Sequence, residues 1–138
     1  MNWCEWFFGI MASLIVVFMS QLINYLIFEP RNTFKRLRNK ISAALIMYAR
    51  YTHNPGDIRI ELEEETDNAI RVLASELNAF SSEYITKTFC HVNMKDAVEA
   101  SGKLIGLANG VYDKGNLKDN EQLETEIKQL LQIKDTNK

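Results

Sequence analysis

An uncharged apolar segment near the N-terminus constrains this chain more than any other feature. Residues 6–28, WFFGIMASLIVVFMSQLINYLIF, contain no Asp, Glu, Lys or Arg. A helix of this length spans about 34 Å, enough to cross a hydrocarbon core of about 30 Å. A soluble protein could bury such a helix only inside a large core, for which 138 residues offer little room. The sequence therefore predicts a transmembrane helix.

The segment divides the chain into an anchor, residues 1–28, and a polar helical domain, residues 29–138. The whole chain has 25% charged residues and a net charge of -2 because its apolar residues gather at one end. A cleaved signal peptide is the alternative to a retained anchor. The N-terminus carries no basic side chain and the apolar run is too long for a signal peptide, so we expect a retained anchor.

Charge on the two sides of the segment predicts its orientation. Only Glu5 is charged before it, whereas five basic residues, the basic cluster, follow within a stretch free of acids: Arg31, Lys35, Arg36, Arg38 and Lys40. The positive-inside rule then places the N-terminus outside and residues 29–138 in the cytoplasm. Anionic lipid headgroups are the expected partner of the basic cluster, at about 1 kcal/mol per residue. Nucleic acid is not expected, since the chain as a whole is not basic.

The apolar segment also carries a line of small and polar residues. At about 100° per residue, five residues share one helix face and are called the stripe: Gly9, Ser13, Val16, Ser20 and Asn24. Small residues four apart let helices approach closely, and an asparagine can form a hydrogen bond across helices. Association with a second copy or a partner helix is one interpretation. The other is that the serines bind their own backbone while Asn24 and Gln21 lie near the headgroups.

Helical spacing of apolar residues predicts about four helices after the anchor, and short connections favour an antiparallel bundle. We expect Pro30 to break or kink the chain and to begin the first of them. Asn93 should cap the third helix, Asn109-Gly110 should end it, and Asp119 or Asn120 should cap the last.

The third of these helices has a predicted inner face and two glycines beside it. Gly102 and Gly106 would allow a close helix crossing there. Seven residues form the inner face: Met94, Ala97, Val98, Ser101, Leu104, Ile105 and Ala108. The chain is thus predicted to be all-α, with one transmembrane helix and a small cytosolic bundle.

No motif for catalysis or for metal binding is found. Cys90 and His91 are adjacent and cannot chelate from one helical face, and no CxxC or HExxH pattern is present. The acidic run around Glu64 lacks the Glu-x-x-His pairs of di-iron bundles and is interpreted as a solvated face. Cys4 and Cys90 should lie on opposite sides of the membrane, which disfavours a disulfide. We expect no enzyme, no cofactor, no metal and no small-molecule substrate.

Three segments resemble small bacterial membrane proteins of uncharacterised function with one N-terminal membrane helix and a helical cytosolic domain. They are EPRNTFKRLRNKISAALIMYAR, the helix with IRVLASELNAF, and LIGLANG, which is similar to a recurring LIGLSN segment with Ala108 in place of serine. The resemblance covers most of residues 29–110. It implies a bacterial inner-membrane protein and supplies no reaction or site residues.

Two functions are expected from these features. The first is a membrane-anchored assembly protein that forms a homo-oligomer or binds a membrane protein through its transmembrane helix, with the bundle as a docking module. The alternative is a small oligomeric effector of the toxin or phage-defence type. It would permeabilise the membrane when triggered through its cytosolic domain.

Overall fold

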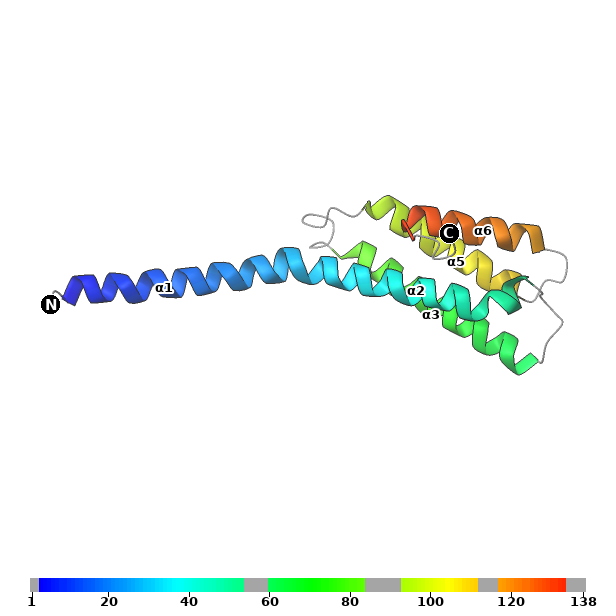
Figure 1. The fold of residues 1–138 in the computed structure, drawn as a ribbon, viewed down its shortest axis with the longest axis horizontal. Helices are drawn as coiled ribbons and strands as arrows, with labels where there is room; N and C mark the ends of the chain where they lie inside the picture. The colour runs from blue at the N-terminus through cyan, green and yellow to red at the C-terminus, as the bar shows by residue number, and fades with distance from the viewer. Residues whose placement is uncertain (1–2, 54–59, 84–92, 112–116, 134–138) are drawn as a thin grey trace.

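The computed structural model describes residues 3–53, 60–83, 93–111 and 117–133, and within these ranges the chain is helical and contains no strand. One continuous helix comprises α1, the π-helical turn η1 and α2, and three separate helices follow. Figure 1 shows α1 projecting from a bundle formed by α2, α3, α5 and α6. The predicted all-α class is confirmed. The bounds are α1 Trp3–Ile23, η1 Asn24–Phe28, α2 Glu29–His53, α3 Ile60–Ser82, α5 Met94–Gly110 and α6 Leu117–Leu130.

The four bundle helices form a closed ring in which neighbours are antiparallel. α2 packs on α3, α3 packs on α5, and α5 packs on α6. α6 also packs on α2, which closes the ring. The end of α3 and the start of α5 lie at the end of the bundle nearer to α1 (Figure 1). This up-and-down order is the one that short connections between successive helices favour.

Each bundle helix contributes an apolar face to one core. Leu37, Ile41 and Leu45 of α2 are buried against α3 and α6, and each such side chain contributes about 1.5–3 kcal/mol when fully buried. The ring centroids of Phe34 on α2 and Phe80 on α3 lie 5.6 Å apart, so the two rings pack across the contact between these helices. The rest of the core comes from the other three helices: Ile70, Ala74, Leu77, Phe80, Ala97, Ala100, Leu104, Leu107, Ala108, Val111, Ile127 and Leu131.

The predicted inner face of α5 is partly wrong. Val98 and Ile105 are exposed, whereas Ala100 and Leu107 are buried. Both α3 and α6 pack on α5, and the arc that they cover is centred on Leu104. Ile105 lies about 100° and Val98 about 120° from that centre, outside the covered arc.

The predicted helix ends are confirmed for α5 and wrong for α6. Asn93 is the N-cap of α5, and its side-chain oxygen accepts from the Lys95 N–H at 3.2 Å. α6 begins at Leu117, so Asp119 lies in its first turn and Asn120 lies inside the helix. The buried Asn120 side chain instead donates to the Gly110 carbonyl at 3.2 Å, because these two residues meet across the α5–α6 contact.

The predicted close crossing occurs at only one of the two glycines. A Cβ added at Gly106 would lie 3.4 Å from Cδ1 of Leu123 on α6, in ordinary contact. One added at Gly102 would meet nothing within 4 Å. The second position faces outward, where no helix of the described chain approaches it.

Pro30 lies in the first turn of α2, as predicted, but the predicted break of the helix is absent. The helix runs through Pro30, and the preceding turn is the π-helix η1, in which the Glu29 N–H donates to the Asn24 carbonyl five residues back. In a regular α-helix the proline ring would clash with the carbonyl of residue 26 and would leave it without a donor. The wider turn accommodates the ring, so the disturbance stays local.

Candidate functional site

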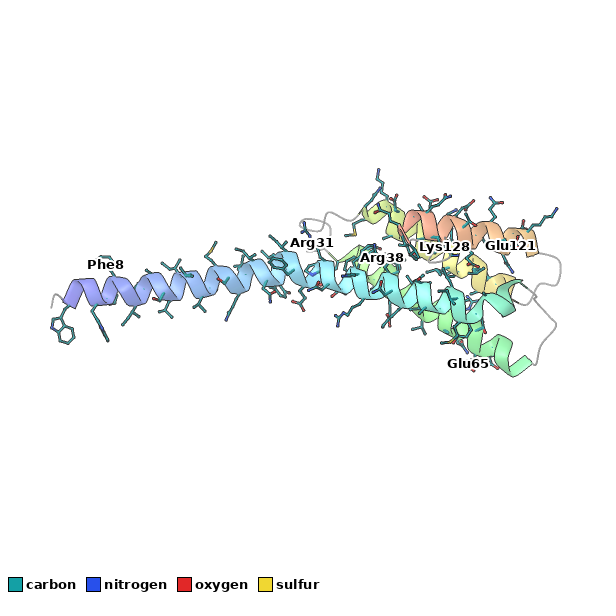
Figure 2. All side chains as sticks on the ribbon, in the orientation of Figure 1. Phe8, Arg31, Arg38, Glu65, Glu121 and Lys128 are labelled. Carbon is teal, nitrogen blue, oxygen red and sulfur yellow. The ribbon has the colours of Figure 1, made fainter. Side chains whose placement is uncertain are left out.

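The described side chains of α1 have no cover within the molecule. From Trp6 to Tyr25 every residue is exposed, and large apolar side chains are among them throughout. Figure 2 shows Phe8 on a part of α1 with no other helix beside it, whereas Arg38 lies alongside the bundle. This helix is the one that is long and apolar enough to cross a membrane, judged by length and composition within the described residues.

Both serines of the stripe bind their own backbone, as the second interpretation of the stripe expects. The Ser13 hydroxyl donates to the Gly9 carbonyl at 2.9 Å, and the Ser20 hydroxyl donates to the Val16 carbonyl at 2.8 Å. These bonds satisfy the hydroxyl hydrogens and leave the oxygens able to accept. A Cβ added at Gly9 would meet nothing within 4 Å, so another helix could approach there closely.

A shallow groove runs along this part of α1. It is lined by six residues, two of them from the stripe: Trp6, Gly9, Ile10, Ser13, Leu14 and Val17. A groove of this kind suits the ridge of a second helix, since side chains of one helix pack into the spaces of the next.

Asn24 stands at the other end of the stripe, where α1 passes into η1. Its backbone carbonyl accepts the π-helical bond, whereas its exposed side-chain amide makes no hydrogen bond within the described residues. An amide can both donate and accept, which makes Asn24 the member of the stripe best suited to bonding across helices.

The basic cluster lies on the first turns of α2. Arg31, Lys35 and Arg36 are exposed and Arg38 is half-buried. The structure places Lys40 differently from its neighbours, since its Nζ lies 3.0 Å from Oε2 of Glu76 on α3. Lys40 thus has a partner in the bundle, which the sequence did not indicate because Glu76 is far along the chain.

A second ionic contact joins α5 to α6. Nζ of Lys103 lies 2.6 Å from Oε2 of Glu126 and 3.5 Å from Oε1 of Glu99. The hydrogen bond from Lys103, with a second from Gln122, lowers the pKa of Glu126 below 4.5. The hydrogen bond to Glu126 raises the pKa of Lys103 above 10.5. The contact braces two helices at the surface of the bundle.

The described residues contain no cluster of three His, Cys, Asp or Glu residues that could hold a metal. Glu64 and Glu65 are exposed on α3, as expected of a solvated face. Cys90 and His91 lie outside the described residues, so the expectation that they form no site stays a prediction.

No protein family, curated protein or solved structure matches this chain. The resemblance to small bacterial membrane proteins stays a prediction. The exposed helix α1, the stripe and the basic cluster are the features of this chain that bear on its function.

Proposed function

We propose that this chain is a single-pass membrane protein that assembles through α1 and presents its helical bundle as a docking module. One observation carries the proposal: α1 exposes apolar side chains around its whole circumference, whereas each bundle helix turns its apolar face inward. A helix that is apolar all round is stable in lipid and not in water. The positive-inside rule favours a cytoplasmic bundle, and the resemblance favours a bacterial inner membrane.

Assembly within the membrane rests on the stripe. Lipid provides no hydrophobic drive for helices to associate, so small residues and interhelical hydrogen bonds supply the attraction. The groove beside Gly9 and Ser13 offers close packing, and the amide of Asn24 offers a hydrogen bond. The partner is a second copy of the chain or another membrane helix.

The assembly proposal is tested by replacing Ser13 and Asn24 with leucine in full-length protein held in nanodiscs. We expect the double variant to raise the dissociation constant of the assembly by about tenfold, equivalent to about 1.4 kcal/mol. Gln21→Leu is the control, because it also replaces a polar residue of α1 but lies about 100° from the stripe. An unchanged mass distribution in the double variant would contradict the role of the stripe.

The basic cluster would bind anionic headgroups through its members nearest to α1. Arg31 and Lys35 form no ion pair within the described residues and lie about 5 and 10 Å beyond Phe28 along the helix axis. We expect Lys35→Gln to weaken binding of residues 29–138 to anionic vesicles about fivefold, for a loss of about 1 kcal/mol. Lys118→Gln removes an exposed charge of the same sign from α6 and should have little effect. Equal effects of the two substitutions would contradict the assignment.

A further inference from the structure

The outer face of α2 is an exposed surface on the bundle. Leu37, Ile41 and Leu45 point into the core, and the opposite side of the helix is open. Ile46 is 68% exposed on that side, and Met47, 67% exposed, lies about 100° around the helix from it. The same outer face continues toward α1 through four further exposed residues: Ala43, Asn39, Lys35 and Asn32.

The turn η1 determines how this outer face is oriented relative to the stripe. Its backbone N–H groups donate to carbonyls five residues back instead of four. The π-helical turn therefore holds one more residue than an α-helical turn, and this extra residue does not rotate the rest of the helix by the usual 100°. Residues after η1 therefore occupy the angular positions that an uninterrupted α-helix would give to their predecessors. Without η1, the outer face of α2 would be turned by about 100° from the stripe.

Because of this one-residue offset, the stripe and the outer face of α2 lie on the same side of the long helix. At about 100° per residue, Lys35, Asn39 and Ile46 lie within about 40° of the mean direction of the stripe. The core residues Leu37 and Ile41 lie about 160° from it. The bundle thus sits on the side of the long helix opposite to the stripe. A single face runs from Gly9 to Ile46, over about 57 Å, with no other described helix on it.

We propose that this continuous face is the contact between two parallel copies of the chain. The proposal rests on the assembly function proposed above and names the partner. Two copies inserted in the same direction have their stripes at the same depth, and their α2 helices leave the membrane side by side. A two-fold contact needs a surface that matches itself, which a single straight face provides. Roughly half of its 38 or so residues would take part, approaching the 20–30 per side of a stable interface.

Among the charged residues of α2, Lys35 lies nearest to the middle line of this face, about 40° from it. In a symmetric pair the two Lys35 ammonium groups would approach each other about 10 Å beyond Phe28, at the level of the headgroups. Like charges would oppose association there unless anionic headgroups lie between them. The pair should therefore form more readily in vesicles that contain anionic phospholipid than in zwitterionic ones.

Cysteine cross-linking in anionic proteoliposomes tests the continuous face with full-length protein. In a Cys4→Ser/Cys90→Ser background, Ile46→Cys is compared with Met47→Cys, its equally exposed neighbour about 100° away. In α1, Ser13→Cys is compared with Ile15→Cys on the opposite side. Disulfides form only between Cβ atoms about 3.5–4.5 Å apart, so the oxidised dimer reports the face directly. We expect cross-linking at positions 13 and 46 and its loss at positions 15 and 47.

The outcomes separate this inference from the proposed function. Cross-linking at position 13 without position 46 would overturn the continuous face and leave assembly through α1 intact. Equal cross-linking at 46 and 47, or cross-linking at 46 without 13, would also overturn it. Failure at both 13 and 46 would count against a paired stripe and so against self-assembly through α1 as well.

Discussion

Gly110 and Asn120 meet where the end of α5 faces the start of α6. The Asn120 side chain is 1% exposed and donates to the Gly110 carbonyl at 3.2 Å. A Cβ at Gly110 would collide with the Asn120 amide. The glycine is therefore required for its small size, because its backbone keeps a conformation open to any residue. The buried amide and the missing side chain fix the register of the two helices.

Gly110→Ala should destabilise the bundle by about 1–3 kcal/mol, the usual cost of overpacking. Gly102→Ala is the matched control, because a Cβ there meets nothing within 4 Å. It should stabilise the helix by about 0.5–1 kcal/mol. Thermal unfolding of the two variants in detergent measures both effects, and a stable Gly110→Ala protein would contradict the close contact.

The ion pair between Lys103 and Glu126 predicts a dependence of stability on pH. Folding lowers the pKa of Glu126. The contribution of its carboxylate to the free energy of unfolding is therefore present above pH 4.5 and is lost as the pH falls through the pKa of the folded state. Glu126→Gln should therefore lower the unfolding midpoint slightly near neutral pH, and the difference should vanish in acid. Glu121→Gln, exposed on the same helix, is the control. A difference that stays constant with pH would contradict the account.

Apolar periodicity is sufficient to predict that a bundle helix has one apolar face, but not how far around the helix that face extends. The spacing of Leu37, Ile41 and Leu45 indicates such a face on α2, and the structure buries it against α3 and α6. Val98 and Ile105 are misplaced on the inner face of α5, because the arc that α3 and α6 cover depends on how the helices pack and cannot be read from α5 alone. The Asn120 contact was missed for a related reason, since an asparagine near a helix start ordinarily acts as a cap.

At the scale of elements, η1 joins two helices that meet different surroundings. The apolar composition of α1 and the amphipathic pattern of α2 were both visible in the sequence. Pro30 was the signal for a disturbance between them, but proline usually ends or kinks a helix. Pro30 removes one backbone hydrogen bond of the helix, and a π-helical turn forms only if particular backbone hydrogen bonds take its place. Residue types alone do not specify that choice. The continuous helix was therefore not predicted.

Pro30→Ala should remove the cause of η1 and allow a regular α-helix, which is the more favourable turn. α2 would then rotate by about 100° relative to α1. We expect the Ile46→Cys cross-link to be lost while the Ser13→Cys cross-link remains. Deleting Ile27 in the Pro30→Ala variant should restore the Ile46→Cys cross-link. A regular helix that is one residue shorter again places the outer face of α2 on the same side as the stripe. A cross-link at position 46 that survives Pro30→Ala alone would show that Pro30 does not hold the register.

At the scale of the whole molecule, the chain places its apolar surface in two separate ways. The bundle encloses one core, whereas α1 extends away from it and exposes its side chains (Figure 1). The first four turns of α2 carry the basic cluster at the junction between these parts, where Figure 2 shows Arg31. This arrangement suits a helix in lipid, positive charge at the headgroups and a bundle in water.

The most direct test of assembly through α1 is the mass of full-length protein in nanodiscs beside that of residues 30–138 in solution. We predict that the full-length protein is a dimer and that the segment is a monomer, because the outer face of α2 alone is too small for a stable interface. A monomeric full-length protein would contradict self-assembly. A dimeric segment would show that the bundle, and not α1, brings the copies together.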